Sequence, residues 1–505
     1  MHRASRLHAQ CDGGQLAWPH LFVAGGPQCT APLPRWASRS AGGTASPFSP
    51  TILTKYDAAQ HRLIKLAAAA AAPEGAAASP AAASTTPTQL PATYRRLVAR
   101  SCGGSFREVA EVVTERLTLP GPGEVLVRVL VAGVNGGCET FRARGEFAFS
   151  GNQGLQGFPL GAEGAGRVVA LGPGVKGLQV GQLVALNGAA AFAEYATARS
   201  SLVVPVPLAP AAVAGAPAAA AVPAAGNGAK GIGPAEAAAL VLSGVTACVA
   251  LEATARIRAG EVVVVTAAAG GTGHFAVQLA ALAGCVVVAV VGGPAKAAAA
   301  AALGAHHVID YSAQDPAAAL QRLFPTGVDV VYEGVGGQLR QAALRCLAPG
   351  GRLLQVGYIS EYPHTKPTSS GSSSSNSSSA SGGGGGTAPA ANASPSTPAA
   401  AATAAAAPTA TATAATAPPA ADLFWGGVDV ELGEGRRVIG QIWPKDLKSL
   451  LRCRKRVFDL AASGALRVIT DEGHGRQGVE GVADAVDYML RGQHVGKVVI
   501  RMGEE

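Results

Sequence analysis

The sequence predicts an α/β protein with two folded domains, one rich in β-strands and one built as a doubly wound parallel sheet. Three observations support this. Glycine-rich alternating stretches fill residues 93–208, short β-branched runs separated by helical runs fill residues 262–357, and low-complexity tracts lie outside them. The chain has 505 residues, which is enough for two or three ordinary domains. We therefore expect two domains accompanied by tails and inserts that do not join a core.

The first 92 residues have the composition of a transit peptide followed by a spacer. Arginines recur over residues 1–40, whereas Asp12 is the only acidic residue before Asp57. We expect residues 1–92 to form a transit-like or disordered extension that directs the chain to an organelle, a plastid or a mitochondrion. A purely disordered extension of a cytoplasmic protein is the alternative.

Residues 93–235 are expected to form the β-rich domain. The runs "TYRRLVARSCGGSFREVAEV" and "GEVLVRVLVAGVN" alternate apolar and polar residues between turn signals, as antiparallel strands do. Glycines spaced through residues 161–181 suit the tight corners of a small, irregular barrel. Residues 211–233 consist largely of Ala, Gly and Pro and are predicted to be a low-complexity insert.

Residues 236–445 are expected to form the parallel-sheet domain. Strand-like and helix-like runs alternate there, at 262–266, 273–283, 285–291, 295–303, 307–310, 316–323, 328–332, 338–347 and 351–357. Such alternation places helices on both faces of a parallel sheet. Residues 365–421 have almost no large apolar side chains, so we expect a disordered insert there.

The stretch Val262–Ala280, "VVVVTAAAGGTGHFAVQLA", has the pattern of a buried strand, a glycine-rich turn and a helix. A turn that opens a helix presents unpaired backbone N–H groups and the positive end of the helix dipole, which suits a pyrophosphate. Gly270 allows the backbone to approach phosphates, and Gly273 allows the helix to pack closely on the strand. Ala268 stands at the first position of the G-x-G-x-x-G pattern, so the pattern is imperfect. The strands and helices that follow favour a dinucleotide site.

The residues after the second strand of this domain favour NADPH over NADH. An NAD site usually has an acidic residue there to bind the ribose hydroxyls. This chain has no Asp or Glu between Glu261 and Asp310, and Lys296 follows the strand instead. A missing carboxylate and an added cation suit a 2′-phosphate. The alternative is that Lys296 is a solvated lysine at the start of a helix.

Composition excludes several classes of protein. The eight cysteines are far apart and form no C-x-x-C pair, which argues against a disulfide framework or a structural zinc site and favours a reducing compartment. The formal charge is +8, but the basic residues are scattered apart from "RCRKR" at 452–456, so no nucleic-acid partner is expected. Residues 275–293 could span a bilayer by length, but Gly284 divides them into a helix and a strand, so no membrane span is expected.

Several stretches are specific enough to compare with known families. They include "GVN" at 133–135, "GAEGAGRVVALGPGV" at 161–175, "LSGVTA" at 242–247, "LGAHHVIDY" at 303–311, "GVDVVYEGVGG" at 327–337 and "GGRLLQVGYIS" at 350–360. Together they resemble the medium-chain dehydrogenase/reductase superfamily, in its zinc-independent quinone-oxidoreductase branch, and within it the prostaglandin reductases. The resemblance covers about 94–208, 236–362 and 435–503. It implies a GroES-like catalytic domain split around a Rossmann domain, with residues 446–505 returning to the catalytic domain, and a homodimer.

The resemblance also assigns roles to individual residues. Asn135 would lie beside the substrate and the nicotinamide, and Tyr358 would border the nicotinamide; both are candidate catalytic residues. The cofactor would be contacted by Thr246, Ala269, Gly270, Gly271, Thr272, Gly273, Lys296, Tyr311, Val335, Gly336 and Tyr358. Asn135 as a turn cap, and Tyr311 or Tyr358 as core residues, are the alternatives.

No metal ligand is assigned. Zinc-dependent members have Cys where Asn135 stands and His where Ala162 stands, and a catalytic zinc needs three protein ligands. His274, His306 and His307 are expected at a helix surface or in loops.

The expected activity is NADPH-dependent reduction of the carbon–carbon double bond of α,β-unsaturated ketones or aldehydes, as in 15-oxoprostaglandin 13-reductases. Such an acceptor is already polarised, so hydride can add to the β-carbon without a metal if donors meet the carbonyl oxygen. An NADPH:quinone oxidoreductase is the alternative enzyme. A non-catalytic NADPH-binding module is the alternative of another class.

Overall fold

The computed structural model describes residues 90–101, 103, 105–143, 157–188, 190–207, 231–362, 429–440, 446–473 and 475–503. Three sequence predictions fall on other residues and lie outside this description. They are residues 1–89 of the 1–92 extension, nearly all of the 211–233 insert, and the whole 365–421 insert.

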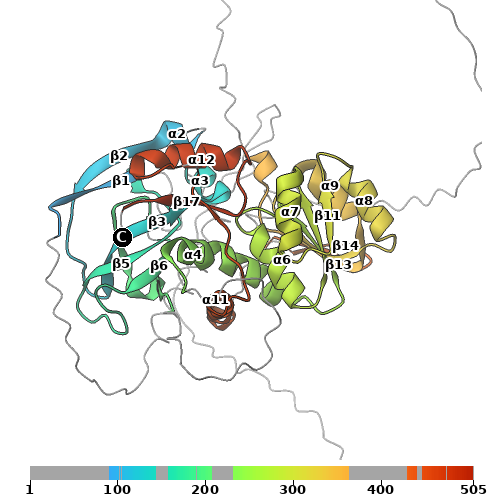
Figure 1. Cartoon of the computed structure of the whole chain (residues 1–505), viewed down its shortest axis with the longest axis horizontal. Coiled ribbons are helices and arrows are strands. Elements are labelled where there is room, and N and C mark those ends of the chain that lie inside the picture. The colour runs from blue at the N-terminus through green and yellow to red at the C-terminus, as the bar shows by residue number, and fades with distance from the viewer. Residues whose placement is uncertain are drawn as a thin grey trace, which may run out of the picture. The chain divides into compact units, whose positions relative to one another are not determined.

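The β-rich domain contains two sheets (Figure 1). Strands β16, β17, β3, β5, β6 and β8 form the larger one in that order, with β7 also paired to β3, and β2, β1 and β4 form the smaller one. The strands are β1 (Thr93–Ala99), β2 (Ala110–Arg116), β3 (Glu124–Gly133), β4 (Phe158–Pro159), β5 (Glu163–Leu171), β6 (Leu183–Asn187), β7 (Tyr195–Arg199), β8 (Val203–Pro205), β16 (Thr470–Asp471) and β17 (Lys497–Arg501).

Short helices accompany these sheets: α2 (Phe106–Val109), α3 (Gly136–Ala143) and the 3₁₀ turn η1 (Ser200–Leu202). Helix α12 (Val482–Leu490), which follows the 3₁₀ turn η5 (Val479–Gly481), contacts α2 and α3 near the start of the fold (Figure 1). Its apolar face, including Val482, Ala485 and Val486, joins one core with residues of β3, β5 and β6. The C-terminal segment therefore completes the core of the N-terminal sheets.

The second domain is a seven-stranded sheet in the order β11, β10, β9, β12, β13, β15, β14. All neighbours are parallel except β14 and β15, which form an antiparallel hairpin at one edge. Without β14 this is the 3-2-1-4-5-6 order of dinucleotide-binding Rossmann domains. The strands are β9 (Val262–Thr266), β10 (Val286–Val291), β11 (His307–Asp310), β12 (Val328–Glu333), β13 (Leu347–Gln355), β14 (Asp429–Gly433) and β15 (Arg436–Ile439). The predicted fold class is confirmed.

Helices cover both faces of this sheet. Residues of α6 and α7 share a core with Val263, Val265 and Val287 on one face, and residues of α8 and α9 share a core with Val264 and Val288 on the other. The helices are α6 (Gly273–Leu282), α7 (Pro294–Ala302), α8 (Pro316–Leu323) and α9 (Gly337–Arg345), and the 3₁₀ turn η4 (Ile359–Glu361) follows β13.

A long buried helix connects the two domains. It runs over Pro234–Ala255 as α4 (Pro234–Ala239), the π-helical turn η2 (Leu240–Gly244), α5 (Val245–Cys248) and the π-helical turn η3 (Val249–Ala255). Among the described helices, this one alone is long and apolar enough to cross a membrane, but 83% of its most apolar window is buried inside the protein. Helix α11 (Leu447–Ala462) packs against α5 and η3. The apolar composition is thus that of a core helix.

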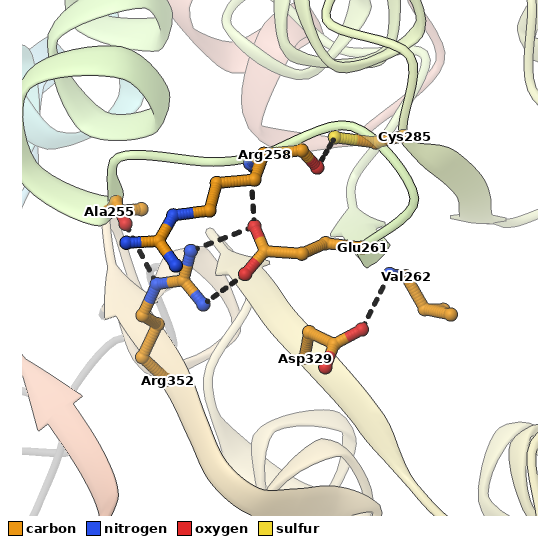
Figure 2. Close-up of polar contacts among 7 residues, drawn as sticks. All are labelled: Ala255, Arg258, Glu261, Val262, Cys285, Asp329 and Arg352. Atoms are coloured by element: carbon orange, nitrogen blue, oxygen red, sulfur yellow. Dashed lines mark hydrogen bonds and ion pairs between the residues drawn. The ribbon is translucent and has the colours of Figure 1, made fainter. Parts of the chain in front are cut away.

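An ion pair fixes the amino end of strand β9 (Figure 2). Arg352 on β13 donates two hydrogen bonds to the Glu261 carboxylate, at 3.0 and 2.9 Å, and a third to the Ala255 carbonyl at 2.8 Å. The Arg258 backbone N–H also donates to Glu261, at 2.7 Å. Burial alone would raise the pKa of Glu261, but these hydrogen bonds and the Arg352 charge together hold the pKa below its usual range.

Replacing Arg352 by methionine is expected to lower the free energy of unfolding by about 1–3 kcal/mol at neutral pH, because it leaves a half-buried carboxylate without its cation. A carboxylate with a lowered pKa stabilises the fold above its unfolded pKa, and this contribution is lost as the pH falls. The difference between the two proteins should therefore shrink below about pH 4 in urea titrations. A difference that stays constant down to that pH would contradict the assignment.

Candidate functional site

A cavity of about 500 Å³ opens at the carboxyl ends of β9, β10, β12 and β13. Ligands of open α/β sheets bind at such edges, where the strand order reverses; here the reversal lies between β9 and β12. Residues of the β-rich domain and of the C-terminal segment also line the cavity. Ten of the predicted site residues line this cavity: Asn135, Thr246, Ala269, Gly270, Gly271, Thr272, Gly273, Lys296, Tyr311 and Val335.

The predicted turn lies between β9 and α6 and faces the cavity. A Cβ atom on Gly273 would lie 2.1 Å from the Ala267 carbonyl oxygen and 2.9 Å from the Ala268 Cα atom. Only glycine therefore allows α6 to start this close to the strand. The first N–H groups of α6 have no partner within the helix, so the turn can hold a phosphate group.

His274 holds the glycine turn by hydrogen bonds to the Gly270 carbonyl and to the C-terminal segment. It is fully buried, so the expectation of a surface or loop position was wrong: the helix starts inside the protein, against the C-terminal segment. Its Nε2 atom accepts from the Ile469 N–H at 3.3 Å, and its Nδ1 atom lies 2.9 Å from the Gly270 carbonyl oxygen. Nδ1 therefore carries the proton and donates to Gly270. Burial lowers the pKa of His274 to about 4, which keeps the ring neutral at pH 7.

The loop after β12 is held by a buried carboxylate that sequence reasoning missed. Glu333 accepts hydrogen bonds from the backbone of Val335 at 2.8 Å and of Gly336 at 3.0 Å, and from the Gln355 amide at 2.6 Å. Burial raises the pKa of Glu333. This network places Val335 in the cavity wall, whereas Gly336 is not part of that wall.

Tyr362 lines the cavity instead of the predicted Tyr358. Tyr358 is buried behind the wall, and its ring packs edge-on against Tyr362 with the centroids 4.9 Å apart. Tyr362 lines the cavity, and burial raises the pKa of its hydroxyl. The sequence offers no signal that separates two tyrosines four residues apart on a loop.

The far end of the cavity is cationic. The Lys296 ammonium is half-buried and donates to the Gly492 carbonyl oxygen, and burial lowers its pKa. Tyr311 is 52% exposed and lies across Gly292, where an added Cβ atom would lie 2.4 Å from the tyrosine hydroxyl oxygen. Asp310 ends β11, but its carboxylate already accepts from Gly293 and Ser312 and is not part of the wall.

The C-terminal segment supplies a wall that sequence reasoning also missed. Arg491, His494 and Lys497 all line the cavity. Burial, together with the charges of Lys296 and Lys497, lowers the pKa of His494 to about 4, so this ring is neutral. The one local signal in the sequence is a lysine inside the apolar run "VGKVVI". Lysines are rarely buried unless they are paired, so this one indicates a buried charge with a partner elsewhere in the chain.

Asn135 lies in a closed ring of polar contacts with two charged residues. Its Nδ2 atom donates to Glu163 Oε1 at 2.7 Å, and its Oδ1 atom accepts from Lys497 Nζ at 2.7 Å. Lys497 and Glu163 also form an ion pair, and their side chains are 2% and 0% exposed. The stem of Lys497 passes over the glycine turn, with Cδ 3.2 Å from a Cβ atom placed on Gly271.

Comparisons with known proteins agree with this architecture. Residues 121–208 match the alcohol dehydrogenase GroES-like domain, and residues 271–387 match the zinc-binding dehydrogenase family. A probable quinone oxidoreductase from Leishmania amazonensis is 35% identical over 275 residues, which cover 54% of this chain and 72% of that protein. The chain belongs to the medium-chain dehydrogenase/reductase superfamily.

Other members of the superfamily are also similar. Prostaglandin reductase-3 from Bos taurus is 35% identical over 275 residues, and the match spans 54% of this chain and 66% of that protein. The structure of Escherichia coli quinone oxidoreductase complexed with NADPH has a TM-score of 0.55 and 21% identity, and the match covers 81% of this chain and 99% of that one. The latter likeness shows the shared fold.

The residues of this member do not fit a zinc ion, although one matching family is described as zinc-binding. Ala162 has no ligand atom, and the Lys497 ammonium already lies against Glu163 and Asn135. Within the described part of the chain, no group of three or more His, Cys, Asp or Glu side chains could hold a metal ion.

Proposed function

We propose that the protein uses NADPH to reduce the carbon–carbon double bond of α,β-unsaturated ketones and aldehydes without a metal ion. The supporting observation is the character of the cavity. Its described lining contains the cationic side chains of Lys296 and Arg491, a third cation, Lys497, whose charge is paired with Glu163, and no acidic side chain. Such a wall suits a polyphosphate cofactor and a reaction in which negative charge develops on the substrate.

Bound NADPH would supply the hydride that adds to the β-carbon, and charge then develops on the carbonyl oxygen. Asn135 is the polar side chain of the wall to which we assign donation to that oxygen, and one such donor typically accelerates a reaction by about 100-fold or more. Apolar residues excluding water from this end of the cavity include Leu242, Ile359 and Met489. Water can protonate the α-carbon.

The preference for NADPH is proposed from the cationic end. Lys296 and Tyr311 would contact the 2′-phosphate, while Gly270 and its neighbours in the turn would contact the pyrophosphate. The Escherichia coli enzyme of the same fold was solved with NADPH. The name of the Bos taurus relative favours a bulky lipid enone, such as a 15-oxoprostaglandin, as substrate.

NADPH oxidation followed at 340 nm with the full-length protein tests this proposal. The acceptors are a 15-keto lipid enone, a short 2-alkenal and a quinone, each with NADPH and with NADH. We expect turnover of the enones with NADPH well above NADH. Turnover of the quinone alone would assign the function suggested by the name of the Leishmania relative. Tight NADPH binding without turnover of any acceptor would indicate a binding module.

A further inference from the structure

We propose that Glu163 and Lys497 are positioning residues that hold the Asn135 amide with one N–H group facing the cavity, ready for the substrate oxygen. The proposal rests on the proposed function, because that function defines which oxygen receives the N–H group. Glu163 and Lys497 act through Asn135 in this account: Glu163 is not part of the cavity wall, and the Lys497 ammonium, although it lines the cavity, is bound to Asn135 and Glu163.

Three neighbouring strands bring the groups together. Gly133 on β3 stands opposite Glu163 on β5 and opposite Val499 on β17. A Cβ atom on Gly133 would lie 2.6 Å from Glu163 Oε1, so only glycine leaves room for the carboxylate. The carboxylate can then reach Asn135, two residues after Gly133 on the same chain segment.

The chemistry of the two neighbours decides which way the amide points. An ammonium group can only donate hydrogen bonds, and a carboxylate can only accept them. Lys497 must therefore face the amide oxygen, and Glu163 must face the amide nitrogen. With a neutral partner at either position, the amide could rotate by half a turn and keep its hydrogen bonds. The ion pair removes this ambiguity.

The same geometry leaves one donor for the cavity. Lys497 Nζ contacts both Oδ1 of Asn135 and Oε1 of Glu163, so the three side chains close a ring. The Nδ2 hydrogen inside this ring is the one on the side of Oδ1. The other Nδ2 hydrogen points away from the pair, and among the described residues no second acceptor for Nδ2 is found. Because Asn135 lines the cavity and Glu163 does not, this hydrogen is directed toward the cavity.

Stabilisation of the sheet is a weak explanation for burying the Glu163–Lys497 ion pair at this place. Replacing a buried ion pair by apolar residues of similar volume is often neutral or stabilising, because desolvation offsets the attraction between the charges. A fixed N–H donor, by contrast, is worth most when it needs no reorganisation during the reaction. Positioning of Asn135 therefore explains the two buried charges better than packing does.

A mutant cycle on the full-length enzyme separates the two explanations. The double variant Glu163→Gln/Lys497→Met removes both charges without leaving one unpaired, Asn135→Ala removes the donor, and the triple variant combines them. We expect kcat for the enone to fall about 100-fold in Asn135→Ala and at least about tenfold in the double variant. The triple variant should be within about threefold of Asn135→Ala, because the ion pair then has nothing to position. The KM for NADPH should change by less than about threefold in the double variant.

The matched control is Glu261→Gln/Arg352→Met, which removes the ion pair at the amino end of β9, outside the cavity wall. Its thermal midpoint is expected to fall while kcat stays within about twofold of the wild type. An unchanged kcat in the Glu163/Lys497 double variant, or losses that multiply in the triple variant, would show that the pair only stabilises the fold and would overturn the proposal.

A binding measurement keeps the proposal separate from the proposed function. A saturated ketone accepts the same N–H group but cannot be reduced at a double bond, so its affinity in the presence of NADP⁺ is measured by calorimetry. We expect the double variant to bind the ketone about tenfold more weakly than the wild type. If the wild type binds the ketone but reduces no enone, the proposed function fails and the ketone affinities decide the positioning role. Equal ketone affinities of the wild type and the double variant would overturn the positioning role. A wild type that binds no ketone would overturn both the positioning role and the proposed function.

Discussion

The substitution Gly273→Ala is expected to weaken NADPH binding by at least about 100-fold, the first of the two largest effects that the structure implies. The added methyl group would lie 2.1 Å from the Ala267 carbonyl oxygen and 2.9 Å from both the Ala267 carbonyl carbon and the Ala268 Cα atom. None of these atoms belongs to a flexible side chain, so the start of α6 must move away from the strand. A misplacement of about 1 Å in a site of this kind lowers the reaction rate roughly 100-fold. We expect a loss of the same order in NADPH affinity.

Gly271→Ala is the matched control, because it adds the same methyl group to the same turn. The nearest atom there is Cδ of Lys497, at 3.2 Å, which belongs to a side chain that can shift slightly. We expect this variant to lose less than about tenfold in NADPH affinity, as measured by quenching of protein fluorescence. Equal losses in both variants would contradict the role assigned to Gly273.

The second large effect concerns cofactor choice. Lys296→Ala is expected to lower kcat/KM for NADPH by about 100-fold, because a charge-assisted contact with the 2′-phosphate is worth about 3 kcal/mol. The value for NADH, which has no 2′-phosphate, should stay nearly unchanged. Equal losses with both cofactors would show that the contact of Lys296 with Gly492 is structural.

Cofactor choice should also depend on pH. Burial lowers the pKa of Lys296, so the ammonium loses its proton at a lower pH than an exposed lysine does. The preference for NADPH therefore declines as the pH rises through this lowered pKa. In Lys296→Ala the ratio of kcat/KM values for the two cofactors should not follow this alkaline decline.

The parallel-sheet domain could be predicted because its signals are local. Val262–Thr266 is a β-branched run, and the glycine turn and the helix follow it within a few residues. The hairpin of β14 and β15 was not predicted in detail. Only β14 alternates charged and apolar residues, over Asp429–Leu432, and β15 has just four residues. The hairpin joins the sheet because β15 pairs with β13, far earlier in the chain.

The candidate site was predictable where one segment makes it and not where distant segments meet. The turn and Lys296 lie on consecutive elements of one domain, and the cavity contains both. Glu163 and Lys497 are separated by more than 300 residues and meet only because β5 and β17 both flank β3. His274 was misplaced for the same reason, since the chain that covers it lies near residue 469.

The measurement that tests the central claim most directly follows the transferred hydrogen itself. NADPH carrying deuterium at both C4 positions is incubated with the protein and a 15-keto lipid enone, and the product is analysed by mass spectrometry and NMR. Reduction of the double bond predicts a saturated ketone with one deuterium atom on the former β-carbon. Deuterium on the carbonyl carbon of an allylic alcohol, or an enone recovered unchanged while a quinone is reduced, would contradict the account.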